Sequence, residues 1–463
     1  MRREKSVRLR VMSLQTNRER NERLPATGTT AADALPPGYG APRRVTHFRW
    51  VILLLVFLAI TINYVDRAVI GLLAPDLKRQ YAISDEAYGY ITSAFALSYA
   101  FGQAISGRWL DWVGTRVGYA VALAAWSVAG MSHALARSAL GFGFARAFLG
   151  VTESPAFPGA VKTLAEWFPR KERAFAMGIV NSGANIGQIV APLLVPWLAL
   201  RFGWQWAFIG TGVVGLLWLF FWLPLYGKPA GHPRVSEGEL AHILRDPPEH
   251  AGHVPWLELL RHRQTWGFVF GKFLTDPIWS FYLFWLPSFF HARHGIDLKN
   301  IGLPLVIVYL MANVGSIAGG WLSSGMIHRG WSVNAARKTA LLICAVGVTP
   351  IVFASVVDNA WAAVMLLGLA TAAHQGFSSN LYTLVSDTFP KQACASVAGL
   401  GGTFGWGGTT LFASLVGLIL GRWTNGNYLP AFIIAGSAYL VAFAVIHFMM
   451  PKLEPAAVGK RAE

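Results

Sequence analysis

Twelve long apolar runs follow one another along the chain, and each has the length that an α-helix needs to cross a bilayer, about 20 residues. The apolar residues are continuous rather than alternating, which favours helices over the strands of a membrane barrel. The pattern predicts an all-α membrane protein with twelve transmembrane helices. The runs cover residues 50–73, 88–110, 117–136, 139–162, 174–200, 205–226, 266–290, 301–322, 338–357, 360–386, 393–421 and 428–450.

A long polar stretch between the sixth and seventh runs divides the helices into two bundles of six. We expect this central loop to be a solvated cytoplasmic linker with a short amphipathic helix. The polar ends of the chain are expected to be cytoplasmic tails, and the first of them to be disordered and basic. The predicted segments are a tail at 1–45, a bundle at 46–226, the loop at 227–265, a bundle at 266–450 and a tail at 451–463.

The composition agrees with a membrane protein, because only 13% of the residues are charged, against about 25% in soluble domains. The net charge of +16 could indicate nucleic-acid binding, but its distribution argues against that. Of the 39 Lys and Arg residues, 28 fall in the two tails and in alternate loops, and 7 fall in the other loops. Positive charge gathers on the cytoplasmic side of membrane proteins. Both termini should therefore be cytoplasmic, in an inner membrane.

The sequence gives no sign of enzymatic or metal chemistry. Cys344 and Cys394 lie in apolar surroundings and are interpreted as small buried hydrophobic residues. The spacing of the remaining polar residues offers no metal site, cofactor motif or catalytic signature. A membrane-bound sensor would carry a folded signalling domain, and neither tail is large enough for one. We therefore expect neither an enzyme nor a resident cofactor.

Four charged residues lie within apolar runs: Asp66 and Arg67 near the end of the first run, and Arg146 and Glu153 inside the fourth. A charge near the bilayer centre costs about 3 kcal/mol on insertion scales, so such residues usually face a bundle interior or a wet cavity. Arg146 and Glu153 are seven residues apart and share one helix face. The first helix can place Asp66 or Arg67 between them. These residues form the candidate working centre, although purely structural ion pairs would have the same sequence pattern.

These residue types suit the coupling of anion binding to proton binding. Burial raises the proton affinity of a carboxylate, and a nearby guanidinium lowers it. An arginine also offers a planar fork that matches the geometry of a carboxylate. An arginine that exchanges a protein carboxylate for a substrate carboxylate would therefore change the proton affinity of the protein group.

Other polar residues in the apolar runs are candidates for lining a binding site. Tyr64 and Tyr99 could line the site or simply pack. A polar stretch in the tenth run could line the site or tie helices together. Lys272 and Asp276 are four residues apart and could pair with each other. The remaining candidates are Asn181, His374, Gln375, Ser378, Ser379 and Asn380.

The loop after the second run has its own pattern, with glycines at 107 and 114 and charges at 111 and 116. Gly107 and Gly114 allow a tight turn and a close approach of helices. Asp111 and Arg116 are expected to join a charge cluster at the ends of neighbouring helices. An ordinary polar turn is the alternative interpretation.

This loop, residues 107–116, resembles the loop signature of the major facilitator superfamily, and residues 146–150 resemble its fourth-helix motif. Residues 320–325 look like a decayed copy of the loop in the second half. That copy fits an internal repeat of six helices, and thus two pseudo-symmetric bundles of the major facilitator fold. It lacks an acid at the position of Asp111, so we expect the ionic contacts that hold the helix ends together (a charge lock) to be weaker there.

Residues 63–67, residues 146–155 and residues 167–173 resemble the anion:cation symporter branch, which includes hexuronate and galactonate transporters. The resemblance implies proton-coupling roles for Asp66 and Glu153, and an interaction of Arg146 with these acids. It also implies that Arg67 holds the substrate carboxylate and that Tyr99 lines the sugar site.

The resulting expectation is a monomeric secondary transporter in the lipid bilayer that imports a small organic anion by proton symport and alternating access. A hexuronate or a related sugar acid is the first choice of substrate. The alternatives are another carboxylate, such as an aromatic acid or a dicarboxylate, and a sensor that does not transport.

Overall fold

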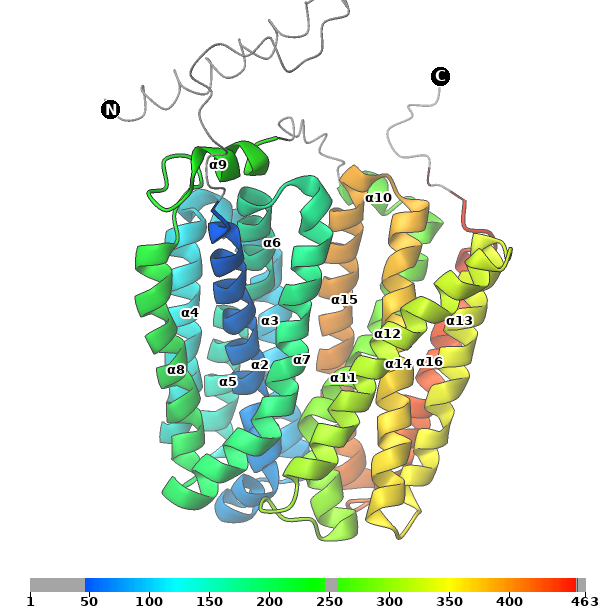
Figure 1. The fold of residues 1–463 in the computed structure, drawn as a ribbon. Coiled ribbons are helices and arrows are strands. Elements are labelled where there is room, and N and C mark those ends of the chain that lie inside the picture. The colour runs from blue at the N-terminus through cyan, green and yellow to red at the C-terminus, as the bar shows by residue number, and fades with distance from the viewer. Residues whose placement is uncertain (1–45, 246–255, 455, 457–463) are drawn as a thin grey trace, which may run out of the picture.

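The computed structural model describes residues 46–245, 256–454 and 456, and the described residues form helices joined by short loops (Figure 1). The predicted tail 1–45 and most of the tail 451–463 lie outside this part of the chain. The first set of helices is α2 (Phe48–Tyr81), α3 (Asp85–Val113), α4 (Thr115–Ser132) with η1 (His133–Leu135), α5 (Ala139–Glu153), α6 (Ala156–Trp167), α7 (Arg170–Phe202) and α8 (Trp204–Leu225).

The second set repeats this arrangement after two short helices, α9 (Glu237–Ile243) and α10 (Trp256–Leu259). Its helices are α11 (Arg263–His294), α12 (Gly302–His328), α13 (Val333–Val348) with η2 (Thr349–Ser355), α14 (Ala360–Thr388), α15 (Lys391–Leu418) with η3 (Ile419–Trp423) and α16 (Leu429–Met449). Each of the twelve predicted runs corresponds to one helix or to two consecutive helical segments that together span the molecule. Within the described residues, eight helices are long and apolar enough to cross a membrane by length and composition.

The two sets of rods stand side by side, as the blue-to-green and green-to-red halves of Figure 1 show. In the first half α2 packs on α7 and α3 on α5, and in the second half α12 packs on α14 and α11 on α15. The halves meet where α3 contacts α15, α2 contacts α11 and α7 contacts α12. The all-α architecture of two six-helix bundles is therefore confirmed.

Glycines bring the two halves together at the end of the molecule opposite α9. A Cβ atom on Gly71 of α2 would collide with the carbonyl of Leu283 in α11, 2.6 Å away. Gly89 of α3 and Gly417 of α15 face each other in the same way, at 2.8 Å. Because no larger residue fits at these positions, the helix backbones themselves seal this end.

The predicted turn after α3 is present, and its two glycines behave differently. Gly114 has a φ of +86°, a backbone conformation that favours glycine. Gly107, in contrast, has open space where a Cβ atom would stand. The expected close helix approach at Gly107 is therefore wrong, because no neighbouring helix reaches it.

The charges around this turn tie neighbouring helices together, but they do not pair with each other. Asp111 forms an ion pair with Lys162 of α6, with 2.7 Å between carboxylate oxygen and ammonium nitrogen. Arg116 donates a hydrogen bond to the backbone carbonyl of Leu223 in α8. The corresponding turn of the second half has a similar lock, because Arg337 of α13 pairs with Asp387 of α14 at 3.0 Å. The acid comes from α14 rather than from the loop, and the expectation that this ionic contact is the weaker of the two stays a prediction.

The central loop contains the expected short helix, α9, but this part of the loop is docked rather than solvated. The carboxylate of Glu239 is fully buried and accepts hydrogen bonds from the backbone N–H groups of Phe48 and Arg49, both at 3.0 Å. It thus caps the start of α2, where unpaired N–H groups favour an anion. Arg49 also pairs with Glu172 of α7 at 3.2 Å, and Glu172 accepts a further contact from His242 of α9.

Candidate functional site

The guanidinium of Arg67 lies at the centre of a polar cluster inside the first half. Its Nε and Nη2 atoms both donate to one carboxylate oxygen of Glu153, at 3.1 and 2.9 Å. The Nη2 atom also donates to the side-chain oxygen of Asn63, one turn earlier on α2, at 3.1 Å. Arg67 is only 2% exposed and Glu153 is completely buried. The first helix therefore places Arg67, rather than Asp66, against the acid of α5.

Aromatic rings enclose the Arg67 guanidinium on its remaining sides. The rings of Tyr64 and Tyr99 each lie 4.8 Å from its central carbon, Phe95 lies at 5.2 Å and Trp406 at 5.4 Å. Trp406 comes from α15 of the second half and packs against Tyr99, with 4.4 Å between ring centroids. Rings stabilise a cation by cation–π attraction while they exclude water. Tyr64 and Tyr99, for which the sequence left site lining and simple packing open, thus both lie beside Arg67, and their role in a substrate site stays a prediction.

A helix break places Glu153 where Arg67 can reach it. The predicted run 139–162 is one rod in two pieces, because α5 ends at Glu153 and α6 begins at Ala156. Pro155 lies in the turn between them, and a proline interrupts a helix because it has no backbone N–H to donate and its ring crowds the preceding turn. The second carboxylate oxygen of Glu153 is buried and has no hydrogen-bond partner. Glu153 therefore keeps an open acceptor beside its ion pair.

Asp66 and Arg146 lie in the same buried region with most of their polar atoms unpaired. Arg146 donates one hydrogen bond, at 3.1 Å, to the backbone carbonyl of Arg67, while its Nε and Nη1 atoms have no partner. Neither carboxylate oxygen of Asp66 has a partner. Thr211 of α8 lies alongside Asp66, but its hydroxyl is bonded to backbone carbonyls of its own helix. Asp66 interacts electrostatically with both Glu153 and Arg146.

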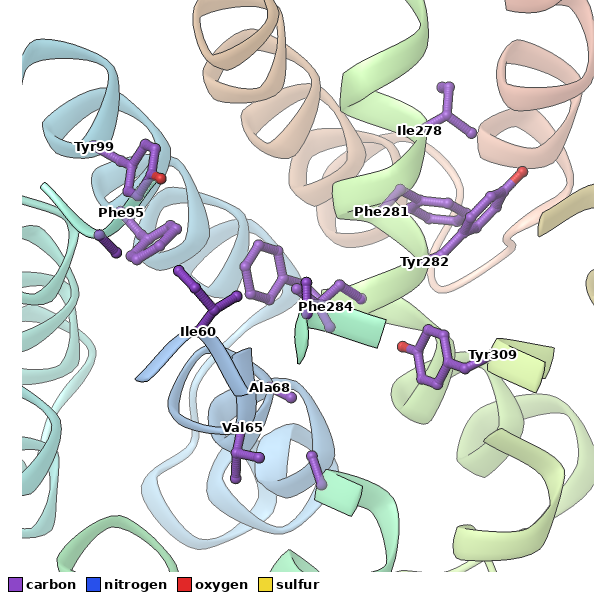
Figure 2. Close-up of a cluster of buried hydrophobic side chains, with 14 of the residues drawn as sticks. Ile60, Val65, Ala68, Phe95, Tyr99, Ile278, Phe281, Tyr282, Phe284 and Tyr309 are labelled. Carbon is purple, nitrogen blue, oxygen red and sulfur yellow. The ribbon is translucent and has the colours of Figure 1, made fainter. Parts of the chain in front are cut away.

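Phe95 and Phe284 separate the two arginines from each other and from the opposite end. Phe95 lies 5.2 Å from the guanidinium carbon of Arg67 and 5.3 Å from that of Arg146. Figure 2 shows Phe284 of α11 directed towards Phe95 of α3, and their ring centroids are 6.2 Å apart. Tyr88 donates a hydrogen bond to the carbonyl of Phe284 at 2.9 Å. The polar cluster is thus closed off on the side opposite α9.

The second half contributes a different set of polar groups. Lys272 and Asp276 form an ion pair along α11, with 2.7 Å between nitrogen and oxygen, as their spacing predicts. The Lys272 ammonium also lies 4.7 Å from the ring of Tyr382 in α14. His374 of α14 is hydrogen-bonded to the hydroxyl of Tyr439 and stacks on Trp279, with ring centroids 4.8 Å apart.

Two of the predicted site-lining residues instead tie helices together. Asn380 is fully buried, and its side-chain amide donates to the carbonyl of Gly319 in α12 at 2.8 Å. Ser379 bonds to Ser316 of α12 at 3.2 Å. Both lie on the side of α14 that packs closely on α12, so their assignment to a substrate site is corrected. Predicted residues that remain at least partly exposed on their helices are Tyr64, Asn181, Gln375 and Ser378, and Ser379 is partly exposed as well despite its bond to Ser316.

Asn63 and Trp406 belong to the site but were not predicted as site residues. The position of Asn63, four residues before Arg67, was an available signal, since side chains at this spacing meet on a helix. Trp406 stands in the glycine-rich stretch 399–408, and a tryptophan with glycines on both sides indicates a special position. Among the described residues, no three histidine, cysteine or acidic side chains are grouped so as to hold a metal ion.

Comparison with known proteins adds family context to this geometry. Residues 56–413 match the family described as Major Facilitator Superfamily. The chain is 34% identical to the hexuronate transporter of Escherichia coli K12 over 81% of this chain and 89% of that protein. It is 29% identical to the probable galactarate/D-glucarate transporter of the same organism, over 88% of this chain and 96% of that protein. A solved D-xylose-proton symporter has the same fold, with a TM-score of 0.68, 16% identity, and coverage of 90% of this chain and all of the other.

Proposed function

Since this chain belongs to the Major Facilitator Superfamily, we propose that it carries a sugar acid, most simply a hexuronate, across the membrane together with protons. It is a multi-pass membrane transporter and not an enzyme. The named relatives carry sugar acids, which supports a small organic anion as the substrate. The observation that carries the proposal is the buried ion pair between Arg67 and Glu153 inside its aromatic enclosure.

The coupling follows from competition for one guanidinium. Arg67 is buried, and Glu153 already occupies its Nε and Nη2 atoms. A substrate carboxylate needs the same donors, because the planar fork is what binds carboxylates in two contacts. Two carboxylates at one cation in a low dielectric repel each other strongly. A proton on Glu153 removes that repulsion and frees Arg67 for the substrate.

Asp66 and Arg146 supply a second acid and base to the same region. A buried carboxylate without hydrogen bonds is costly as an anion, and a bound proton removes this cost. Arg146 is bonded to the backbone at Arg67 and interacts with both acids, so a shift of this helix segment changes the surroundings of both. We assign proton coupling to Asp66 and Glu153 and a positioning role to Arg146. Substrate-binding roles remain assigned to Arg67, Tyr64, Tyr99, His374 and Gln375, with Ser378 and Asn181 at the margin.

Alternating access fits the distribution of contacts between the halves. Glycine backbones seal the end opposite α9, so we infer that the substrate leaves towards the α9 end in this conformation. The surplus of Lys and Arg in the tails and in alternate loops favours a cytoplasmic position for the α9 end and for both termini. The protein is proposed to act as a monomer in the inner membrane, with the proton as its coupling ion and no resident cofactor or nucleic-acid partner.

The test is uptake of a panel of sugar acids into proteoliposomes that contain the purified protein, with and without an imposed pH gradient. We expect accumulation of at least one uronate or aldonate, driven by an inward proton gradient and abolished by a protonophore. Uptake of aromatic acids or simple dicarboxylates alone would replace the substrate assignment. Uptake that ignores the gradient would contradict proton symport.

A further inference from the structure

The ion pair between Lys272 and Asp276 has no role in the competition at Arg67, and its two members differ in exposure. The side chain of Lys272 is 7% exposed, whereas that of Asp276 is 25% exposed. The ammonium group is enclosed by Asp276 and by the ring of Tyr382. The carboxylate is therefore the member of the pair that a bound solute can meet.

The pair borders the same region as Arg67, from the other half of the protein. Gly405 of α15 makes room for Asp276, because a Cβ atom at this position would overlap the carboxylate. The next residue, Trp406, packs on Tyr99 and covers the Arg67 guanidinium at 5.4 Å. Residues 405 and 406 of α15 thus connect the Arg67 cluster to the Lys272–Asp276 pair.

The charges on the two sides of this region determine whether a solute with one carboxylate or with two carboxylates binds better. Arg67 is the cation to which a solute carboxylate can bind once Glu153 is protonated. Lys272 already has its counter-ion at contact distance, so it adds little attraction for a second carboxylate. A second carboxylate on the solute would instead approach the partly exposed side chain of Asp276, and like charges placed together disfavour a wrong ligand strongly. A hydroxyl group at the same place can donate a hydrogen bond to Asp276.

We propose that Asp276 restricts this carrier to sugar acids with a single carboxylate, by repelling a second carboxylate at the far end of the molecule. This inference rests on the proposed function and refines it to uronates and aldonates, as opposed to aldarates. Lys272 holds Asp276 in place and balances its charge within the membrane. Neutralisation of Asp276 alone leaves Lys272 as a free cation, which attracts the second carboxylate.

Galactonate and galactarate are a matched pair of probes, since they share one carbon chain and differ in a terminal hydroxymethyl group or carboxylate. Each is used to compete with labelled substrate in proteoliposomes of the wild type, Asp276→Asn, Lys272→Gln/Asp276→Asn and Asp276→Glu. For the wild type we expect galactonate to compete at least tenfold better than galactarate. In Asp276→Asn this preference should fall by at least tenfold, with the double variant between the two and Asp276→Glu close to the wild type.

The double variant keeps the test decisive if Asp276→Asn is poorly folded, because it leaves no unpaired charge in the membrane. Asp358→Asn, at an exposed carboxylate far from the site, serves as a control that should leave the preference unchanged. A wild type that favours galactarate, or variants that lose both ligands in parallel, would overturn the inference while uptake of sugar acids upholds the proposed function. A wild type that moves no sugar acid would overturn both.

Discussion

The two halves of this transporter repeat one helical plan but differ in how the ionisable groups buried near the middle of their helices are paired. In the first half, Asp66, Arg146 and Glu153 all keep donors or acceptors without partners. In the second half, Lys272 is paired with Asp276, and His374 is bonded to Tyr439. Unmet polar atoms in a low dielectric are costly, so they persist where protonation or a ligand can satisfy them. From this difference we assign proton coupling and carboxylate binding to the first half, and recognition of the rest of the solute to the second half.

The largest expected effect is that of Glu153→Gln, which removes the proton site but keeps the shape and a hydrogen-bond acceptor for Arg67. Accumulation driven by a pH gradient should be lost completely, whereas exchange of internal for external substrate should persist. Proteoliposomes with matched internal pH measure both activities. Asp387→Asn, which breaks the ion pair of the second-half turn, is the control and should retain accumulation. Normal accumulation by Glu153→Gln would remove Glu153 from the coupling.

Arg67→Lys should weaken substrate binding by roughly 10- to 100-fold, since one charge-assisted hydrogen bond contributes about 1.5–3 kcal/mol. Lysine keeps the charge but loses the planar fork. Lys272→Arg, in the second half, keeps its charge in the same way and should change the affinity much less. Binding measured by calorimetry on purified protein compares the two, and equal effects would contradict the assignment of the anion anchor to the first half.

Two buried asparagines sharpen the comparison at a smaller scale. Asn380→Ala removes a tie between α14 and α12 and should lower stability by about 1 kcal/mol, with an unchanged KM. Asn63→Ala removes a hydrogen bond to Arg67 and should raise the KM several-fold, with a smaller change in stability. Thermal unfolding and initial uptake rates separate the two outcomes. The reverse pattern would mean that Asn380 contacts the solute.

The smallest effect is expected outside the membrane-spanning part, at Glu172. Partial burial opposes ionisation there, but the contact with His242 and the ion pair with Arg49 together hold the pKa of the Glu172 carboxyl below its ordinary value. A lowered native pKa means that the ionised form stabilises the docked α9. This stabilisation is present above the ordinary glutamate value, about 4.3, and is lost as the pH falls through the lower native value. Proteolysis of the central loop against pH should show the loss in the wild type and not in Glu172→Gln.

The sequence predicts the transmembrane helices well, because each apolar run must be a helix in lipid, where every backbone polar group needs a partner. It also predicts that the charges of the first half gather in one region, since charged residues in a membrane usually face a bundle interior. It leaves open whether Asp66 or Arg67 meets Glu153 and whether the two tyrosines line the site. The break at Ser154 and Pro155 was not predicted, although Pro155 is a signal for it, because a proline inside a helical run removes a backbone hydrogen bond.

The errors concern contacts that depend on how helices face each other. Asn380 and Ser379 share a polar stretch with His374, yet the helix turns them towards α12. Asp387, which completes the second-half lock, lies on a different helix from the motif that it serves. Trp406 reaches the site from the other half, and nothing local in the sequence places it beside Arg67.

The central claim is that the substrate carboxylate and Glu153 compete for Arg67, so that substrate binding takes up a proton. Calorimetric titration of the purified protein with a uronate, repeated at one pH in buffers of different ionisation enthalpy, measures this proton directly. The account predicts net proton uptake on binding in the wild type and reduced uptake in Glu153→Gln. Binding without proton exchange, or with the same exchange in both proteins, would contradict it.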